Sequence, residues 1–473
     1  MDLGQFLAIQ SRRSFLNQVA AGLGSIALGD LLHASGASEN PLAPKKPHFA
    51  ATAKSVIFLF MEGGPSQMDL FDPKPELQKW NGQPAPASIT SKLQLAFTKP
   101  NAAILASPRQ FKPHGQSGTE FADWIPGIAS AADDICLVRS MHTDAFNHHP
   151  GQLLLFTGSQ QFGRPTLGAW SIYGLGSESQ NLPGFVVLSS GVGTSGGATN
   201  FSSGFMPSTY QGTPLRSSGD PILYLSNPPG ISGASQRAGL DALRDLNQMH
   251  QVSAGDREIT ARIASYELAY RMQTAGPELT DFSKESAATL ESYGLNNPKT
   301  KQHGANCLLA RRLVERGVRY VMLMNASWDN HTQLNKKLKD NCDATDQPTG
   351  ALLKDLKQRG LLDSTLVVWG GEFGRTPVSE IRNSMEEGNA GRDHHPNAYS
   401  MWLAGGGIKG GQVIGKTDEL GFFITEDPVH VHDLQATILH TLGFDHTRLT
   451  YRHMGRDFRL TDVEGNVVKK MLT

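Results

Sequence analysis

The chain has 473 residues, with 43 Lys and Arg against 44 Asp and Glu, a net charge of −1 and 39% hydrophobic residues. A chain of this length can bury a large core without disulfides or structural metal ions, so disorder throughout the chain is excluded. The balanced charge, without a basic block, excludes a general nucleic-acid binder, and three cysteines without a CxxC spacing exclude a zinc ribbon.

Residues 1–37 carry the pattern of an export signal. Ser11-Arg12-Arg13-Ser14-Phe15-Leu16 places twin arginines before Phe-Leu, and a weakly apolar stretch follows at residues 19–32. Small residues at 34–37 offer a signal-peptidase site. The alternative is an amphipathic helix with two surface arginines. We predict a twin-arginine (Tat) signal, with the Tat export machinery as a partner and a periplasmic or otherwise exported mature protein.

A linker is predicted at residues 38–53, where Pro41, Pro44 and Pro47 stand. Beyond it, short apolar runs alternate with helical patterns. Strands are predicted at Lys54–Met61, Ile135–Val138, Phe185–Leu188, Val318–Met324, Thr365–Trp369 and Tyr399–Leu403. Helices are predicted at Phe121–Ala132, Gln236–Thr274, Gly304–Arg316, Gly350–Arg359 and His432–Leu442. No run reaches the roughly 20 apolar residues of a membrane-spanning helix.

This alternation predicts an α/β fold, a three-layer sandwich with a mostly parallel central sheet, over residues 54–473. A loop insertion rich in Gly, Ser and Pro is expected near residues 190–233, over one end of the sheet. A peripheral helical cap is expected near residues 236–295, where the helical pattern is more polar.

Polar side chains gather where the predicted strands end. They are Glu62, Ser66 and Asp69; His142, His148 and His149; Asp329 and His331; Glu372 and Arg375; and, before the last core strand, Asp393, His394 and His395. Because ligands bind beyond the carboxyl ends of strands in open α/β sheets, these segments should converge. Carboxylates and imidazoles from five segments suit a divalent metal ion.

Each piece also has a simpler interpretation. Asp329-Asn330-His331 alone is more often a capped turn than a pair of ligands. His394-His395 is more often one surface residue and one packed residue, and Glu372 alone could cap a helix. The occurrence of all five polar segments at the ends of predicted strands favours the metal site.

The motifs resemble the alkaline phosphatase and sulfatase superfamily, and most closely the bacterial family named domain of unknown function fifteen-oh-one. The closer resemblance covers nearly the whole chain. It is carried by the twin-arginine start, Glu62-Gly-Gly-Pro-Ser-Gln-Met-Asp69, Phe71-Asp72-Pro73-Lys74-Pro75, Trp328-Asp329-Asn330-His331, Gly371-Glu372-Phe373-Gly374-Arg375-Thr376-Pro377, Gly391-Arg392-Asp393-His394-His395-Pro396 and the tail from Leu449 to Asp462. The resemblance implies an alkaline phosphatase-like fold.

The comparison with sulfatases implies a role for several residues. Glu62 takes the place of the metal-binding Asp-Asp pair at the end of the first strand. At the end of a later strand, Glu372 supplies a carboxylate, and Phe373 stands where sulfatases have a second ligand. In the frame of the nucleophile motif, His148 stands at the nucleophile position and Gln152 replaces the supporting arginine. A further set, Asp329, His331 and either His394 or His395, resembles the ligands of the second metal of alkaline phosphatases.

With neither Cys nor Ser at position 148, the formylglycine mechanism and a seryl-phosphate intermediate are excluded there. Metal-activated water or a covalent intermediate on His148 remains, and water is favoured because a His among ligands is usually itself a ligand. Ser66 is another candidate nucleophile, although its loop more often needs only a small turn residue. Arg375 is expected to bind anionic oxygens, or else to pair with Glu372 or Asp393.

The predicted function is an exported metal-dependent hydrolase of phosphate or sulfate esters, acting on a small anionic ester or a sulfated or phosphorylated glycan. The alternative is a catalytically inactive exported metal- or glycan-binding protein of the same fold. One or two divalent ions are expected, and His-rich ligation favours zinc, manganese or iron over calcium or magnesium. Neither nucleic acid nor a stable membrane span is expected.

Overall fold

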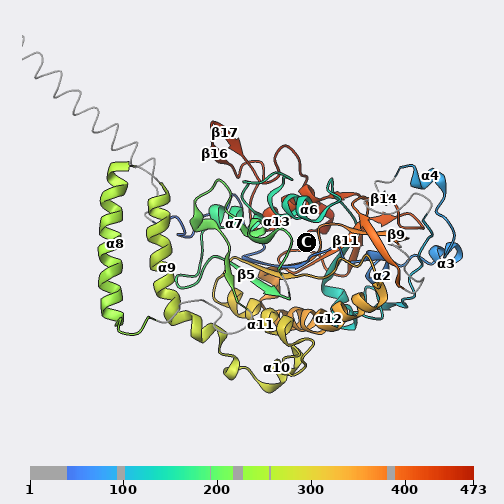
Figure 1. Cartoon of the computed structure of the whole chain (residues 1–473), viewed down its shortest axis with the longest axis horizontal. Coiled ribbons are helices and arrows are strands. Elements are labelled where there is room, and N and C mark those ends of the chain that lie inside the picture. Colours follow the sequence, from blue (N-terminus) through green and yellow to red (C-terminus); the bar gives the residue numbers. More distant parts are fainter. Residues whose placement is uncertain (1–39, 93–101, 192, 217–226, 255–256, 381–388) are drawn as a thin grey trace, which may run out of the picture. The chain divides into compact units, whose positions relative to one another are not determined.

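A nine-stranded sheet lies between layers of helices in residues 42–473 (Figure 1). Its strand order is β12-β4-β11-β8-β1-β7-β5-β6, with β15 paired to β4. Its strands are β1 Ser55–Met61, β4 Ile135–His142, β5 Phe185–Ser190, β6 Thr213–Leu215, β7 Tyr320–Asn325, β8 Thr365–Gly370, β11 Tyr399–Ala404, β12 Gln412–Ile414 and β15 Val429–His430. Strand β11 runs antiparallel to β4 and β8. The other pairings in this sheet are parallel.

This computed structural model describes residues 40–92, 102–191, 193–216, 227–254, 257–380 and 389–473. The predicted export signal at residues 1–37 lies outside the described residues. Residues 42–473 form one unit. The first residues of this unit are held by hydrogen bonds to later parts of it: Lys45 N donates to Leu175 O at 2.8 Å, and His48 N donates to Gly443 O at 2.9 Å. The predicted linker and domain boundaries stay predictions.

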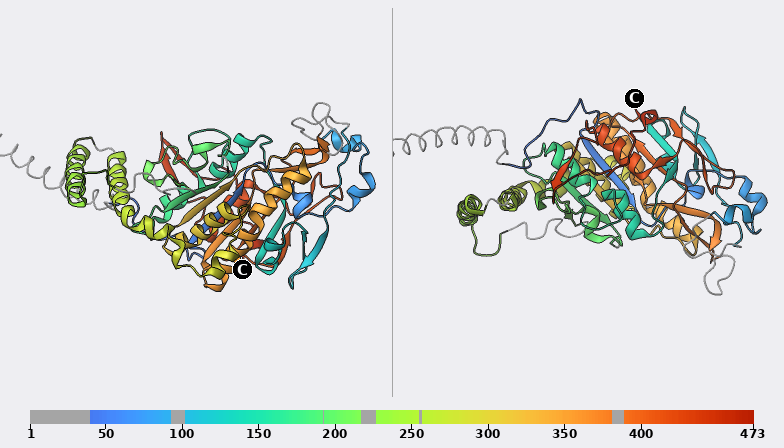
Figure 2. Two further views of the ribbon diagram at one scale, coloured as in Figure 1. Left: turned by 60° about the horizontal axis from the view of Figure 1, so that its bottom comes forward. Right: turned by 90° about the horizontal axis from the view of Figure 1, so that it is seen from above.

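Helices cover both faces of the sheet. On one face lie α5 Pro126–Ala129, α11 Lys301–Glu315 and α12 Leu334–Gln358, and on the other lie α6 His148–Thr157, α7 Leu167–Leu175 and α13 Val431–Thr441 (Figures 1 and 2). The predicted three-layer α/β sandwich with a mostly parallel sheet is therefore confirmed.

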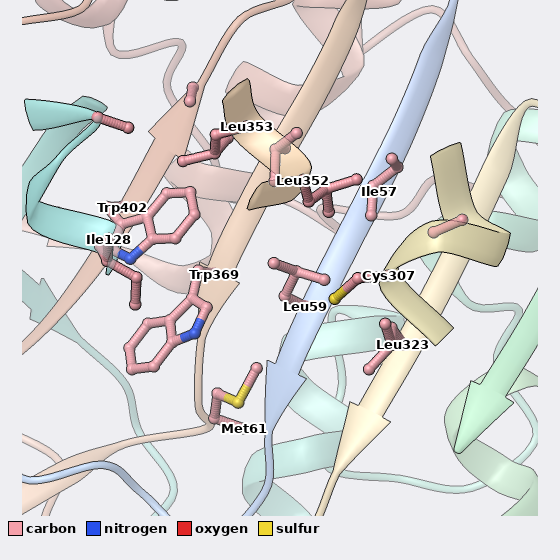
Figure 3. Packing of buried hydrophobic residues seen from close by; sticks show 14 of the residues in the cluster. Ile57, Leu59, Met61, Ile128, Cys307, Leu323, Leu352, Leu353, Trp369 and Trp402 are labelled. Atoms are coloured by element: carbon pink, nitrogen blue, oxygen red, sulfur yellow. The ribbon is translucent and has the colours of Figure 1, made fainter. Parts of the chain in front are cut away.

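Strand β1 shows why its sequence is apolar without alternation. Its residues are all buried, and successive side chains enter opposite layers. Ile57, Leu59 and Met61 pack with α11 and α12, as Figure 3 shows for Leu352, Leu353 and Cys307. Val56, Phe58 and Phe60 pack with α6, α7 and α13. A strand covered on both faces needs apolar residues at every position.

All six predicted strands are present, whereas the helix predictions were partly wrong. Residues 121–132 contain the end of β3, Thr119–Ala122, and the short α5 rather than one helix. The residue before a proline avoids helical geometry, so a helix here begins only at Pro126. The predicted helix at residues 236–274 is two helices, α8 Gly233–Ala254 and α9 Arg257–Thr280. Helices α6 and α7 were not predicted, because they are buried on most sides and lack an amphipathic period.

The remaining elements lie around the sandwich. Short helices are α2 Gln67–Leu70, α3 Glu76–Trp80, α4 Ala87–Thr90 and α10 Ala287–Ser292. Antiparallel pairs are β2 Phe111–His114 with β3, β9 Gly374–Glu380 with β10 Gly391–His395, β13 Lys416–Thr417 with β14 Ile424–Glu426, and β16 Tyr451–His453 with β17 Arg456–Phe458. Helices α8 and α9 lie side by side (Figures 1 and 2). Among the described residues, no helix has both the length and the apolar composition for crossing a bilayer.

Candidate metal centre

The loops that follow β1, β7 and β8 meet at one edge of the sheet. Strand register aligns Met61 with Asn325 and Phe60 with Gly370, so the three strands end together. Trp328 N donates to Glu62 O at 3.0 Å. Gly63 has a φ of +116°, and a Cβ there would lie 2.3 Å from the backbone nitrogen of Asp329. Glycine is therefore required for this close approach of the first loop to the second.

The second loop carries Asp329 and His331 in a constrained backbone. Ser327 and Gln333, on either side of the pair, have φ angles of 89° and 54° in the left-handed region. Non-glycine residues there cost of order 1–3 kcal/mol each and cluster at functional sites. The strained residues lie two positions before Asp329 and two positions after His331.

Three imidazoles surround one oxygen of Asp329. Asp329 Oδ1 lies 2.9 Å from His331 Nε2, 3.3 Å from His148 Nε2 and 3.5 Å from His394 Nε2. His331 Nε2 and His394 Nε2 are 3.0 Å apart. Together these residues offer four ligand atoms within 4.8 Å of one another. The Asp329 side chain is 42% exposed, so the cluster is open to solvent on that side.

The other nitrogen of each ring lies against a carboxylate or carbonyl oxygen. His148 Nδ1 lies 2.6 Å from Glu372 Oε1, and His394 Nδ1 lies 2.6 Å from Phe146 O. His331 Nδ1 contacts the Glu380 carboxylate. Each Nδ1 therefore carries a hydrogen, and in the neutral ring the Nε2 lone pair faces Asp329. Metal-binding histidines are oriented by the same kind of partner.

Burial and the nearby charges act in opposite directions on these groups. Burial would lower the pKa of His148, but hydrogen bonds and charge from Asp329 and Glu372 raise it to about 9. Burial would raise the pKa of Asp329, but hydrogen bonds from the three histidines and the charge of Arg375 hold it far below its usual range. Burial lowers the pKa of His394. Protons and a cation would therefore compete for the same atoms.

A second group joins the first through His148. Glu62, His148 and Glu372 each offer a ligand atom within 4.8 Å of the others. Gly63 N donates to Glu372 at 3.2 Å, which fixes this carboxylate, and Glu372 is fully buried. Phe373 packs on the imidazoles, with ring centroids 4.4 Å from His394 and 5.1 Å from His148. The predicted ligands Glu62, Asp329, His331, Glu372 and His394 thus come together around His148.

A third group contains two carboxylates, Asp393, which stands among the polar side chains at the predicted strand ends, and Glu380, which no sequence motif singles out. His331, Glu380 and Asp393 are all buried, and their ligand atoms lie within 4.8 Å of one another. Glu380 ends β9, and only the pairing of Glu380 with Gly391 across the β9–β10 hairpin brings it to this place. No motif spacing in the sequence indicates the contact of Glu380 with His331, whereas Asp393 is adjacent to His394 in the sequence.

Arg375 is placed differently from the predicted substrate contact. Its side chain is fully buried. Nε donates to Gly64 O at 3.0 Å, Nη1 donates to Arg392 O at 2.9 Å, and Nη2 contacts Gly63 O and lies 2.5 Å from Asp329 Oδ1. The guanidinium therefore ties the first loop to β10 and neutralises Asp329, and its donors are engaged within the protein.

His395 does not join the site. Among the described residues, the groups that could hold a metal ion include His394 and not its neighbour. Successive side chains of a strand point to opposite faces, so in β10 only one of the two can face Asp329. His395 is buried beside Gly421 and Phe422, and burial lowers its pKa to about 4.

Comparison with known families gives one match that spans nearly the whole chain. The family described as "Protein of unknown function (DUF1501)" matches residues 53–472, so the chain belongs to this family. The resemblance seen in the sequence motifs is thereby confirmed. Among curated proteins, none matches the chain.

The solved structures that resemble this chain include a sulfatase, an alkaline phosphatase and a lipoteichoic acid synthase. The PsFucS1 sulfatase from Pseudoalteromonas sp. is 12% identical, with 88% of this chain and 70% of that chain covered and a TM-score of 0.36. The alkaline phosphatase from the Antarctic bacterium TAB5 is 12% identical, with 83% and 97% covered and a TM-score of 0.31. The lipoteichoic acid synthase LtaP from Listeria monocytogenes is 8% identical, with 89% and 78% covered and a TM-score of 0.34. At such identities and TM-scores, the likeness assigns no residue a role.

Proposed function

We propose that this protein is an exported metal-dependent hydrolase of phosphate or sulfate esters. The observation that carries the proposal is the convergence of three imidazole Nε2 atoms on Asp329 Oδ1 while each Nδ1 is held by an acceptor. Two facing nitrogen lone pairs 3.0 Å apart repel each other unless a proton or a cation lies between them. A divalent ion that replaced this proton would be held by three imidazole nitrogens and one carboxylate oxygen, a donor set that suits it.

The nature of the donors favours zinc, manganese or iron, because imidazole nitrogens suit these ions better than calcium or magnesium. Asp329, His148, His331 and His394 would hold one ion, and Glu62 and Glu372 would extend the site to a second ion next to His148. A bound ion of this kind supplies positive charge for an anionic ester and lowers the pKa of a water molecule from 15.7 to about 7.

The chain's own residues prepare the site for that chemistry. Glu380, Glu372 and Phe146 O fix the ring orientations through Nδ1, so the ligand atoms need little rearrangement. Arg375 holds Asp329 and both glycines of the first loop. Phe373 covers the rings of His148 and His394 and excludes water from that side.

Neither candidate for a side-chain nucleophile is well placed. Ser66 is 1% exposed and donates to Asp69 at 2.5 Å, so its hydroxyl is buried away from solvent. His148 has one ring nitrogen on Glu372 and the other toward Asp329. An attacking imidazole must be neutral and unmetallated, so we assign His148 as a ligand and water as the nucleophile.

Metal analysis combined with turnover tests the proposal. The purified protein should contain at least one divalent ion per chain and should hydrolyse a generic aryl phosphate or aryl sulfate until a chelator removes the ion. Metal without turnover of either ester would instead support the inactive metal- or glycan-binding protein, which the lack of Ser or Cys at position 148 favours as second candidate. Protein without metal would contradict both.

The role of His148 is tested by its alanine variant. His148→Ala should lose metal affinity together with activity. If the variant kept its full metal content while turnover stopped, and the wild type accumulated an acid-labile phosphorylated histidine, His148 would be the nucleophile.

Export is tested on the twin arginines of the proposed signal. Arg12→Lys with Arg13→Lys should leave the protein uncleaved in the cytoplasm, because lysine keeps the charge but not the guanidinium group. Normal periplasmic delivery of this double variant would refute Tat export.

A further inference from the structure

Gln152 lies one helical turn after His148 on α6, so both side chains are on the same face of the helix. His148 faces Asp329 and Glu372, whereas Gln152 faces Glu62. The Gln152 side chain is 0% exposed. Helix α6 therefore contacts every carboxylate of the first two groups through two residues.

The Gln152 amide uses all of its hydrogen-bonding capacity. Nε2 donates to Glu62 Oε1 at 3.1 Å and to Ser195 Oγ at 2.9 Å. Oε1 accepts from Gly196 N at 2.9 Å and from Asn200 Nδ2 at 2.9 Å. Such an amide has a fixed orientation, because exchanging its oxygen and nitrogen would break all four bonds.

Three of these four partners belong to residues 193–200, a segment between β5 and β6 that we call the covering loop. Ser195 N also donates directly to Glu62 Oε1 at 3.2 Å. Asn200, which is fully buried, anchors the loop internally by donating to Thr194 Oγ1 at 3.1 Å. One oxygen of Glu62 is thus held from two sides, by α6 and by the covering loop, which leaves Oε2 for a cation.

We propose that Gln152 is a positioning residue that links cation binding at Glu62, His148 and Glu372 to the order of the covering loop. This inference rests on the proposed function, because it requires a cation in that group. A carboxylate with a fixed orientation binds an ion with less loss of conformational freedom. By reciprocity, an ion that holds Glu62 stabilises the loop that bonds to it.

A merely structural role for Gln152 predicts a different result. In that case any change to a buried amide beside α6 would weaken the fold, without a specific effect on the ion or on the loop. Gln435 on α13 provides the matched comparison. It is 1% exposed and donates to Leu154 O and Leu155 O of α6 at 2.7 and 2.9 Å, away from the carboxylates.

The experiment compares wild type, Gln152→Glu, Gln152→Met and Gln435→Glu as full-length protein stripped by a chelator. Zn²⁺ affinity is measured by calorimetry, and hydrogen exchange of residues 193–200 is measured with and without Zn²⁺. Gln152→Glu places a carboxylate against Glu62, and Gln152→Met removes the four hydrogen bonds without adding charge, which provides a test if the charged variant fails to fold.

In wild type, Zn²⁺ should slow exchange in the covering loop. Both Gln152 variants should lose the ion-dependent protection. Gln152→Met, which adds no charge next to Glu62, should also bind the more weakly held Zn²⁺ about 10–100-fold less tightly, the range found when an outer-shell partner is lost. Gln435→Glu should keep affinity and protection. Wild-type behaviour in both Gln152 variants, or equal losses in Gln435→Glu, would overturn the inference. Zn²⁺ binding and loop protection without ester turnover would refute the hydrolase and leave the inference standing.

Discussion

Two groups of histidines lie at the same edge of the sheet, and only one of them is arranged for a metal ion. The first is His148, His331 and His394 around Asp329. The second is His142 at the end of β4 with His430 and His432, where the ring centroids of His142 and His430 are 4.9 Å apart. The two groups have the same residue types and similar burial, but the partners of their ring nitrogens differ.

In the second group the ring nitrogens of His430 and His432 contact neighbouring backbone and Asp144. His430 Nδ1 accepts from His432 N at 3.2 Å and so caps α13, which leaves the ring hydrogen on Nε2, 3.2 Å from Asp144 Oδ2. His432 Nε2 lies 3.1 Å from Gly158 O. Burial lowers the pKa values of His142 and His430. In the first group, by contrast, acceptors hold one nitrogen of each ring and the other nitrogens converge on Asp329.

Replacing Asp329 should give the largest effect. Asp329→Asn keeps the shape of the side chain but removes the charge on which the three imidazoles converge, so metal affinity should fall by more than about 100-fold, beyond the range for outer-shell partners. Elemental analysis and calorimetry measure this loss, and circular dichroism checks the fold. Asp144→Asn, the equivalent change in the second group, should retain the metal, and equal losses in both variants would remove the distinction between the groups.

A smaller loss is expected when the partner of a ring nitrogen changes. Glu380→Gln keeps an oxygen that can accept from His331 Nδ1 but removes the carboxylate charge, so metal affinity should fall by about 10-fold. Calorimetric titration with Zn²⁺ measures the change. An unchanged affinity would show that this buried carboxylate does not tune His331.

Metal binding should depend on pH through His148. With its pKa raised to about 9 by Asp329 and Glu372, this imidazole is protonated below that pH and must release a proton to bind an ion. Apparent affinity should therefore rise about tenfold per pH unit for this proton between roughly pH 7 and 9 and then level off. A flat profile across this range would contradict the predicted competition. The comparison is best made with an ion that does not hydrolyse there, such as Mn²⁺.

The smallest effect on the metal is expected from the second group. His430→Ala removes the cap of α13 and should lower the free energy of unfolding by about 1 kcal/mol. Metal affinity should not change. Denaturant unfolding and calorimetry measure the two quantities separately, and a loss of metal here would extend the site to the second group.

Much of the candidate site could be predicted because it depends on strand ends. Glu62, Asp329 and Glu372 follow β1, β7 and β8, which are apolar runs in the sequence and end at one edge of the sheet. His148 was found at the start of a helix that the periodicity did not show. The main strands of the central sheet could be predicted as well, because strands covered on both faces are continuous apolar runs in the sequence.

The contacts that depend on β9 and β10 could not be predicted, since neither strand has an apolar pattern. Arg375 lies in β9, whose residues are all buried, so a charged side chain that suggested a substrate contact is inside the protein. Glu380 reaches His331 only through the hairpin. His395 was predicted as a ligand because the sequence does not show that it lies in a strand, where neighbouring side chains point to opposite faces.

The position of β1 in the sheet has a consequence for the order in which the chain can fold during synthesis. Its two neighbours, β7 Tyr320–Asn325 and β8 Thr365–Gly370, are made long after it. Until the ribosome has completed β8, the seven residues of β1, all buried in the final fold, lack at least one of their two lateral partners. Long-range pairing of this kind folds slowly and leaves an apolar strand available to other nascent chains. We expect Ser55–Met61 to stay unpaired for much of synthesis, and the metal ligands to assemble only after translation has passed His394.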